Sequence, residues 1–304
     1  MVAVTFLAGG ATCMPRRSIP EFQPKPIFTS DPTREQLADV INRSRNVQSL
    51  QSNSVTVNVN NERTINTNLT WAREKRFRMT ASVAGVAGVD IGSNDEAFWM
   101  AIRGGLTKEM YYARHVEFES QIERPVLPVS PIWLIQAMGI CEIDLYRLVQ
   151  EPVRRADGMI ELTTLEPSPI GNYIRTLVID PKYGCSREVY LRDPTGRFVA
   201  NAKQAKHEYY ASAQSSLPHH VKVQLMPSGN EVLELDISIA SYVVNSLAND
   251  NNTQFEMPKT NGYRVINLGQ IGAQSIVPQQ VAPPMPNYPQ NAYRGVSGEG
   301  LTIR

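Results

Sequence analysis

Two neighbouring stretches decide the fold, Trp71-Ala-Arg-Glu-Lys-Arg-Phe-Arg-Met79 and Gly92-Ser-Asn-Asp-Glu-Ala-Phe-Trp99. In the first stretch, Phe77 and Met79 alternate with polar side chains. The second begins with a Ser-Asn-Asp turn, and the alternation restarts at Phe98. Because successive side chains of a strand face opposite sides, this pattern predicts a sheet with one apolar face and one polar face.

The same period of two continues along most of the chain. Leu233 to Ile239 is the cleanest alternation, Phe198 to Tyr210 predicts one long strand, and Ile143 to Val149 predicts another. The connections are too short for crossover helices, so the strands pair as antiparallel hairpins. About ten strands at this spacing predict a mainly β (α+β) fold, with a large antiparallel sheet that must curl or close.

Two segments predict helices instead. Ser30-Asp31-Pro32 supplies an N-cap and a proline for a helix that runs to Val47 with a narrow apolar stripe. Ser130-Pro131 opens a short helix over residues 132–138 that is almost entirely apolar. Such a helix is either a plug in the core or a lid over an apolar cavity.

Composition limits the function classes. The chain has 304 residues, 42% of them hydrophobic and 19% charged, with a net charge of +1. This allows one or two globular domains and provides no general attraction to nucleic acid. No nucleophile elbow, phosphate-binding loop or zinc-protease motif occurs, and the histidines lack metal-ligand spacing. We therefore expect a protein that is not an enzyme and needs no cofactor or metal.

The N-terminus has the pattern of a bacterial lipoprotein signal. Residues 1–13 are an apolar run with small residues that ends at Cys13, which would become the lipidated residue. The other interpretation is a frayed terminus with a chance cysteine. Residues 14–29 predict a proline-rich tether, and residues 276–304 predict a disordered tail rich in proline and glutamine. No long apolar stretch that could span a bilayer follows.

Two further cysteines leave an alternative open. Cys141 and Cys185 are not in a Cys-x-x-Cys pair. They would form a disulfide in an oxidising compartment, or remain buried free thiols.

The order of these elements resembles the LolA/LolB-like lipoprotein-carrier superfamily, in particular its outer-membrane lipoprotein-sorting-like bacterial proteins. The resemblance covers roughly Asp31 to Leu268, and the following segments carry it: the helix 31–47, the stretches 71–78 and 92–99, Pro131-Ile132-Trp133-Leu134-Ile135, and Phe255-Glu256-Met257-Pro258 with the apolar run that ends at Leu268.

This resemblance implies an unclosed β-barrel over residues 30–275, with helices on its concave side and a cavity that takes acyl chains. Arg73 would lie at the cavity rim, and the lining residues would be Phe77, Met79, Phe98, Met100, Ile132, Trp133 and Ile135. The lipidated Cys13 would place the chain among the membrane-anchored members of the superfamily.

The sequence therefore predicts a monomeric cell-envelope lipoprotein that faces the periplasm and is anchored to the outer membrane. Its partners would be a lipid or the acyl chains of another lipoprotein, and not nucleic acid. The alternative is a tethered scaffold or interaction domain with a solidly packed barrel. An apolar cavity distinguishes the two, because the scaffold predicts none.

Overall fold

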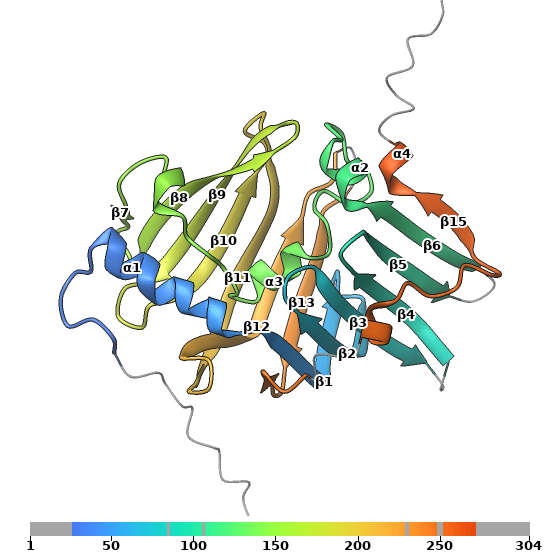
Figure 1. Cartoon of the computed structure of the whole chain (residues 1–304), viewed down its shortest axis with the longest axis horizontal. Helices are drawn as coiled ribbons and strands as arrows, with labels where there is room; N and C mark the ends of the chain where they lie inside the picture. The colour runs from blue at the N-terminus through green and yellow to red at the C-terminus, as the bar shows by residue number, and fades with distance from the viewer. Residues whose placement is uncertain (1–25, 84–85, 105–106, 229–230, 248–251, 272–304) are drawn as a thin grey trace, which may run out of the picture.

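The structure is a computed structural model that describes residues 26–83, 86–104, 107–228, 231–247 and 252–271. These residues form one large β-sheet with short helices against it (Figure 1). The predicted signal segment 1–13, most of the predicted tether 14–29 and the predicted tail 276–304 lie outside the described residues.

The sheet holds 15 strands among the described residues, and most of them follow one path in the order β15-β6-β5-β4-β3-β2-β1-β13-β12-β11-β10-β9-β8-β7, while β14 pairs with β1 beside it. The bounds are β1 (Ser49–Val59), β2 (Arg63–Ala72), β3 (Arg76–Val83), β4 (Val86–Ser93), β5 (Ala97–Gly104), β6 (Thr107–Arg114), β7 (Val153–Arg154), β8 (Ile160–Ser168), β9 (Gly171–Asp180), β10 (Cys185–Arg192), β11 (Phe198–Tyr210), β12 (Ser215–Leu225), β13 (Leu233–Ile239), β14 (Val243–Val244) and β15 (Arg264–Asn267).

Two antiparallel meanders make up this path. One contains β1 to β6 and the other contains β7 to β13, and they join where β1 pairs with β13, with Val57 opposite Ile237. The path ends at β7 on one side and β15 on the other, so the sheet curves without closing (Figure 1). The predicted fold class is confirmed, although β15 pairs with β6 in parallel and makes the sheet mixed.

The helices are short, with bounds α1 (Arg34–Ile41), η1 (Asn42–Asn46), α2 (His115–Glu119), α3 (Trp133–Ala137), η2 (Leu145–Arg147), η3 (Asn252–Phe255) and α4 (Leu268–Ile271). The first helix begins later than predicted. Thr33 is its N-cap, because the Thr33 hydroxyl accepts from the Gln36 amide and the Gln36 side chain accepts from the Thr33 amide. These two reciprocal hydrogen bonds set the start of the helix at Arg34, although Ser30 and Asp31 are also residue types that favour an N-cap.

The strand predicted over Ile143 to Val149 is wrong. The Asp144 carboxylate accepts a hydrogen bond from the Tyr146 amide and starts the turn η2. Leu145 and Leu148, three residues apart, both pack against the main core, and Tyr146 is fully exposed. A tight helical turn explains this spacing as well as an extended strand does, so the alternation alone was ambiguous.

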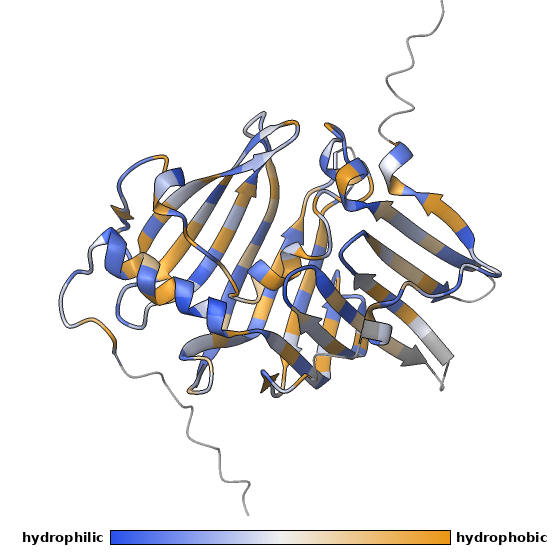
Figure 2. Cartoon of the chain, viewed as in Figure 1, coloured by the Kyte–Doolittle hydropathy of each residue, from blue (hydrophilic) through white to orange (hydrophobic). Residues whose placement is uncertain are grey.

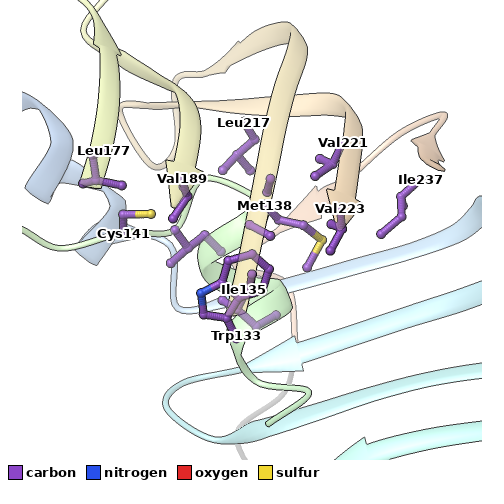
Figure 3. Close-up of a cluster of buried hydrophobic side chains, with 14 of the residues drawn as sticks. Trp133, Ile135, Met138, Cys141, Leu177, Val189, Leu217, Val221, Val223 and Ile237 are labelled. Carbon is purple, nitrogen blue, oxygen red and sulfur yellow. The ribbon is translucent and has the colours of Figure 1, made fainter. Parts of the chain in front are cut away.

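The main core lies on the concave side of the sheet, against the second meander and against β1 to β3 of the first. Trp133, Ile135 and Met138 of the α3 region project among apolar side chains of the sheet, which include Leu177, Val189, Leu217, Val221, Val223 and Ile237 (Figure 3). Figure 2 shows the matching pattern, with apolar positions alternating along the strands behind α1 and α3. The short apolar helix therefore packs as a plug.

Candidate ligand-binding cleft

A cleft of about 720 Å³ lies between α1, the segment that follows Pro131 and the concave side of the sheet. Its lining includes nine charged side chains, Trp71 of β2 and four isoleucines of the 131–147 region: Ile132, Ile135, Ile140 and Ile143. The wall exists because α3 turns toward the sheet. Gln204 of β11 donates through Nε2 to the Ala137 carbonyl at 2.8 Å and so holds the last turn of α3.

Glu142 connects the charged residues at the rim of this cleft. Its carboxylate accepts from Arg45 Nε at 2.9 Å and from Arg73 Nη1 at 3.0 Å. Burial by itself would raise the pKa of Glu142, but these two hydrogen bonds outweigh it and lower that pKa. Arg73 also donates to the carbonyls of Val47 and Ser44, so its guanidinium is held on three sides.

Three of the residues predicted from the sequence line this cleft: Arg73, Ile132 and Ile135. Three others, Phe77, Met79 and Trp133, belong to the main core. The remaining two lie farther along the first meander. Phe98 joins a second cluster with Phe118, and Met100 is half-buried opposite Ile91 and Tyr111. Cys13 lies outside the described residues.

Sequence reasoning missed most residues of the cleft, among them Trp71, Glu142 and Arg175. Trp71 stands at the head of the stretch that decided the fold, and its position on the apolar face was a usable signal. Glu142, in the segment between α3 and η2, and Arg175 of β9 gave no such signal, because a lone charged residue usually faces water. Arg175 is instead 5% exposed, and its Nη2 lies 2.9 Å from Glu166 Oε1.

One nucleophile and one base are in contact elsewhere in the molecule. Ser93 Oγ lies 3.3 Å from His115 Nε2, and both residues are buried. His115 Nε2 also lies 2.9 Å from the Asn94 carbonyl oxygen. A carbonyl only accepts, so this nitrogen carries the proton and is not a base toward Ser93. The contact therefore does not form a catalytic pair.

The described residues also bear on metals and membranes. No group of three or more histidine, cysteine or acidic side chains in the described ranges is arranged to hold a metal ion. The helices found there are all too short to span a bilayer.

Cys141 and Cys185 are both buried and free. Of the two alternatives that the sequence left open, a disulfide or buried free thiols, the structure has the free thiols.

No protein-family model and no curated protein matches this chain. Solved structures similar to it include three bacterial proteins. A domain described as outer membrane lipoprotein-sorting, from Vibrio parahaemolyticus, is 9% identical, with 69% of this chain and 92% of that chain covered and a TM-score of 0.45. A LolA superfamily protein from Nitrosomonas europaea is 14% identical, with 72% and 97% covered and a TM-score of 0.44. A DUF1329 family protein from Desulfovibrio piger is 11% identical, with 75% and 100% covered and a TM-score of 0.46. Two of the three are described as lipoprotein-sorting or as LolA superfamily proteins.

Proposed function

We propose that this chain binds an apolar ligand, a lipid or the acyl chains of a lipoprotein, in the cleft between α1, the 131–147 segment and the sheet. The cleft itself carries the proposal. Its volume of about 720 Å³ lies within the range of roughly 300–1,000 Å³ that is usual for small-molecule sites. Of its four isoleucines and Trp71, the half-buried Ile132 offers apolar surface to a chain, and the other four residues lie buried behind the lining.

Burial of apolar surface would supply the affinity, at ~25 cal/mol per Å². Because that term is non-directional, the site would accept chains of different length and saturation. The charged residues at the rim are paired with one another, as Glu142 is with Arg45 and Arg73. A neutral chain can therefore enter the cleft without breaking these ion pairs.

The depth of binding depends on α3. Ile132 and Ile135 line the cleft as it stands, with Arg73 at its rim. Phe77 and Met79 are covered by the main core, so a ligand would reach them and Trp133 only after α3 moves. Phe98 and Met100 continue the same face of the sheet through the cross-strand pairs of β4 and β5 and would contact the far end of a long chain.

The proposal includes the setting of the protein. It would be a monomeric, periplasm-facing lipoprotein of the cell envelope, anchored to the outer membrane through a lipid on Cys13. It would act by binding and not by catalysis, and would take part in lipid or lipoprotein trafficking without nucleic acid as a partner.

One observation favours a second candidate, a scaffold or interaction domain with a solid core. Trp133, Ile135 and Met138 already occupy the concave side among the sheet residues (Figure 3). On this alternative the cleft is a surface feature with no ligand, and the sheet presents its outer face to a partner.

The discriminating experiment is native mass spectrometry of the full chain, purified from the membranes of a diderm bacterium, with extraction of any bound lipid. The proposal expects a lipid in stoichiometric amount. An empty protein that also fails to take up a fluorescent fatty acid would leave the scaffold as the better account.

A matched pair of variants places the ligand. Ile132→Trp fills the cleft from a half-buried position and should abolish binding of the fluorescent fatty acid. Val232→Trp adds the same ring at an exposed position away from the cleft and should leave binding unchanged. Trp133→Ala removes the anchor of α3, and loss of the bound lipid in that variant would show that α3 helps to hold it. Equal binding by the two tryptophan variants would exclude the cleft.

A further inference from the structure

The apolar face of the first meander continues beyond the residues that the cores cover. Val89 of β4 pairs with Ile102 of β5, and Met100 of β5 pairs with Ile91 on one side and with Tyr111 on the other. Ile102 is 37% exposed, and the other four residues are half-buried. Val89, Met100 and Ile102 belong to none of the hydrophobic clusters that the described residues form. These five residues, the β4–β5 patch, are a contiguous apolar surface of the kind that marks an interaction site.

The described part of the chain ends beside this patch. Ile271, the last residue of α4, packs with Tyr111 against the second cluster. The Gln121 side chain donates through Nε2 to the Leu268 carbonyl at 2.7 Å and so holds α4 in this position. Figure 1 shows α4 next to β6, the strand that carries Tyr111. Residues 272–304 therefore continue from the edge of the β4–β5 patch.

The sequence of this C-terminal segment suits an apolar surface. Residues 272–293 contain no charged side chain, and their first large aliphatic residues are Ile276, Val277 and Val281. Pro278 is followed by further prolines, and proline favours the extended polyproline II conformation. Extended proline-rich segments bind grooves that are lined by apolar and aromatic side chains, because little conformational entropy is left to lose.

The charges at the patch also match an uncharged occupant. Glu109 of β6 is opposite Ile102. Glu109 Oε2 accepts from Tyr111 Oη at 2.8 Å, and Glu109 Oε1 lies 3.7 Å from Arg264 Nη1. Both carboxylate oxygens therefore have partners, and an uncharged segment can cover Ile102 without displacing them.

The segment reaches the patch within a few residues. β4 lies two strand spacings, about 10 Å, from β6. Five extended residues, 272–276, span about 15 Å at ~3.1 Å each, so Ile276 and Val277 can reach Met100 and Ile91. Because the segment is attached to α4, its effective concentration at the patch is on the order of millimolar. A free partner would have to match that concentration.

We propose that residues 276–281 dock on the β4–β5 patch, with Ile276 and Val277 against Met100 and Ile102. The inference goes beyond the proposed function and does not depend on a ligand. Its consequence for the proposed function is competition. The far end of a long apolar ligand would meet Met100 as well, and would displace the segment from it.

Disulfide trapping in the full chain tests the docking. In a Cys13→Ser background, Val277→Cys is combined either with Ile102→Cys in the patch or with Lys108→Cys as the control. Ile102 and Lys108 are both exposed, but they face opposite sides of the sheet, because Glu109 is the residue opposite Ile102. The patch pair should form its intramolecular disulfide roughly tenfold faster than the control pair, because docking raises the effective concentration. Equal rates would overturn the proposal, and so would a disulfide that forms mainly between two chains.

A second measurement leaves the patch residues unchanged. Ile276→Asp places a carboxylate in the docked segment and should release it, because burial of an unpaired charge is costly. Val296→Asp makes the same kind of change outside residues 276–281 and should have no effect on docking. The readout is the methyl resonance of Met100 in nuclear magnetic resonance, assigned by its loss in Met100→Leu. It should shift in Ile276→Asp only, and an identical resonance in wild-type protein and both variants would overturn the proposal.

The two claims can fail separately, because neither measurement uses a ligand. If the fluorescent fatty acid binds while the two disulfide rates are equal, only this inference fails. If the segment docks and no lipid or fatty acid binds, the proposed function fails and this inference stands. If both hold, a saturating long-chain fatty acid should slow the disulfide between positions 102 and 277, and an unchanged rate would refute the competition.

Discussion

Arg78 on β3 and Asp90 on β4 form a two-point ion pair, with Nε 3.1 Å from Oδ1 and Nη2 2.7 Å from Oδ2. Asp90 Oδ1 also accepts from Trp99 Nε1 at 3.2 Å, and Arg78 Nη1 donates to the Gln254 carbonyl at 2.8 Å. The pair thus joins three neighbouring strands to the segment that begins with η3. It lies on the face of the first meander opposite to Phe77, because strand neighbours alternate.

Replacing Arg78 with methionine should lower the free energy of unfolding by about 1–3 kcal/mol, because the substitution leaves Asp90 buried without its charged partner. The measurement is urea denaturation, with hydrogen exchange of the Gln254 region as a second readout. That region should exchange faster in the variant. Arg34→Met is the control, since Arg34 pairs with Glu35 at an exposed site, and its effect should stay within about 0.5 kcal/mol. Equal losses in the two variants would contradict the structural role of the Arg78 pair.

Gly92 lies directly beneath the ring of Trp99. A Cβ atom at position 92 would lie 2.1 Å from Trp99 Cζ2, so alanine does not fit unless the ring moves. We expect Gly92→Ala to destabilise the protein by about 1–3 kcal/mol, the usual cost of overpacking. Thermal unfolding of Gly92→Ala, Trp99→Leu and the double variant checks the cause. If the clash is responsible, the two losses are less than additive in the double variant, whereas simple additivity would refute it.

His207 should make stability depend on pH. Burial, together with the positive charge of Arg187, lowers the pKa of His207 from 6.5 to about 4. Between these two pH values the unfolded chain binds a proton that the folded chain does not. The contribution of His207 to the free energy of unfolding is therefore fully present above pH 6.5 and is lost as the pH falls toward 4. The loss is on the order of 3 kcal/mol.

Urea denaturation of wild-type protein and of His207→Gln across this pH range measures the effect. The variant should show a shallower loss of stability on acidification. Some loss should remain, because burial also lowers the pKa of His115. Identical pH profiles for the two proteins would show that His207 is not responsible.

The two buried cysteines should be unreactive in the folded protein. Burial raises the pKa of Cys141 to about 11 and that of Cys185 to about 12, so neither forms the reactive thiolate at mildly alkaline pH. In a Cys13→Ser background, a thiol reagent should modify neither residue until urea is added, after which both react. The count is made by mass spectrometry. Rapid modification of the native protein would place at least one thiol at the surface.

Several elements could be predicted because their signal is local. Phe198 to Tyr210 was predicted to be one long strand, and it forms the single strand β11. The segment after Pro131 is too apolar for a free helix, and α3 is buried as that composition requires. The stretch from Ile143 to Val149 misled because its apolar residues recur at intervals that fit either a strand or a tight helical turn. Strand β15 was harder still, since its parallel partner β6 is far away in the sequence.

The sequence by itself determined the class of the fold, the curvature of a sheet with one apolar face, and the presence of a short helix that has to be buried. These follow from periodicity and capping, which act between residues a few positions apart. Only the tertiary structure decided that Val57 meets Ile237, and that Trp71, Glu142 and Arg175 surround one cleft. The physical reason is that an alternating strand has an apolar face which many partners can cover equally well. Which partner it meets depends on the packing of the whole chain.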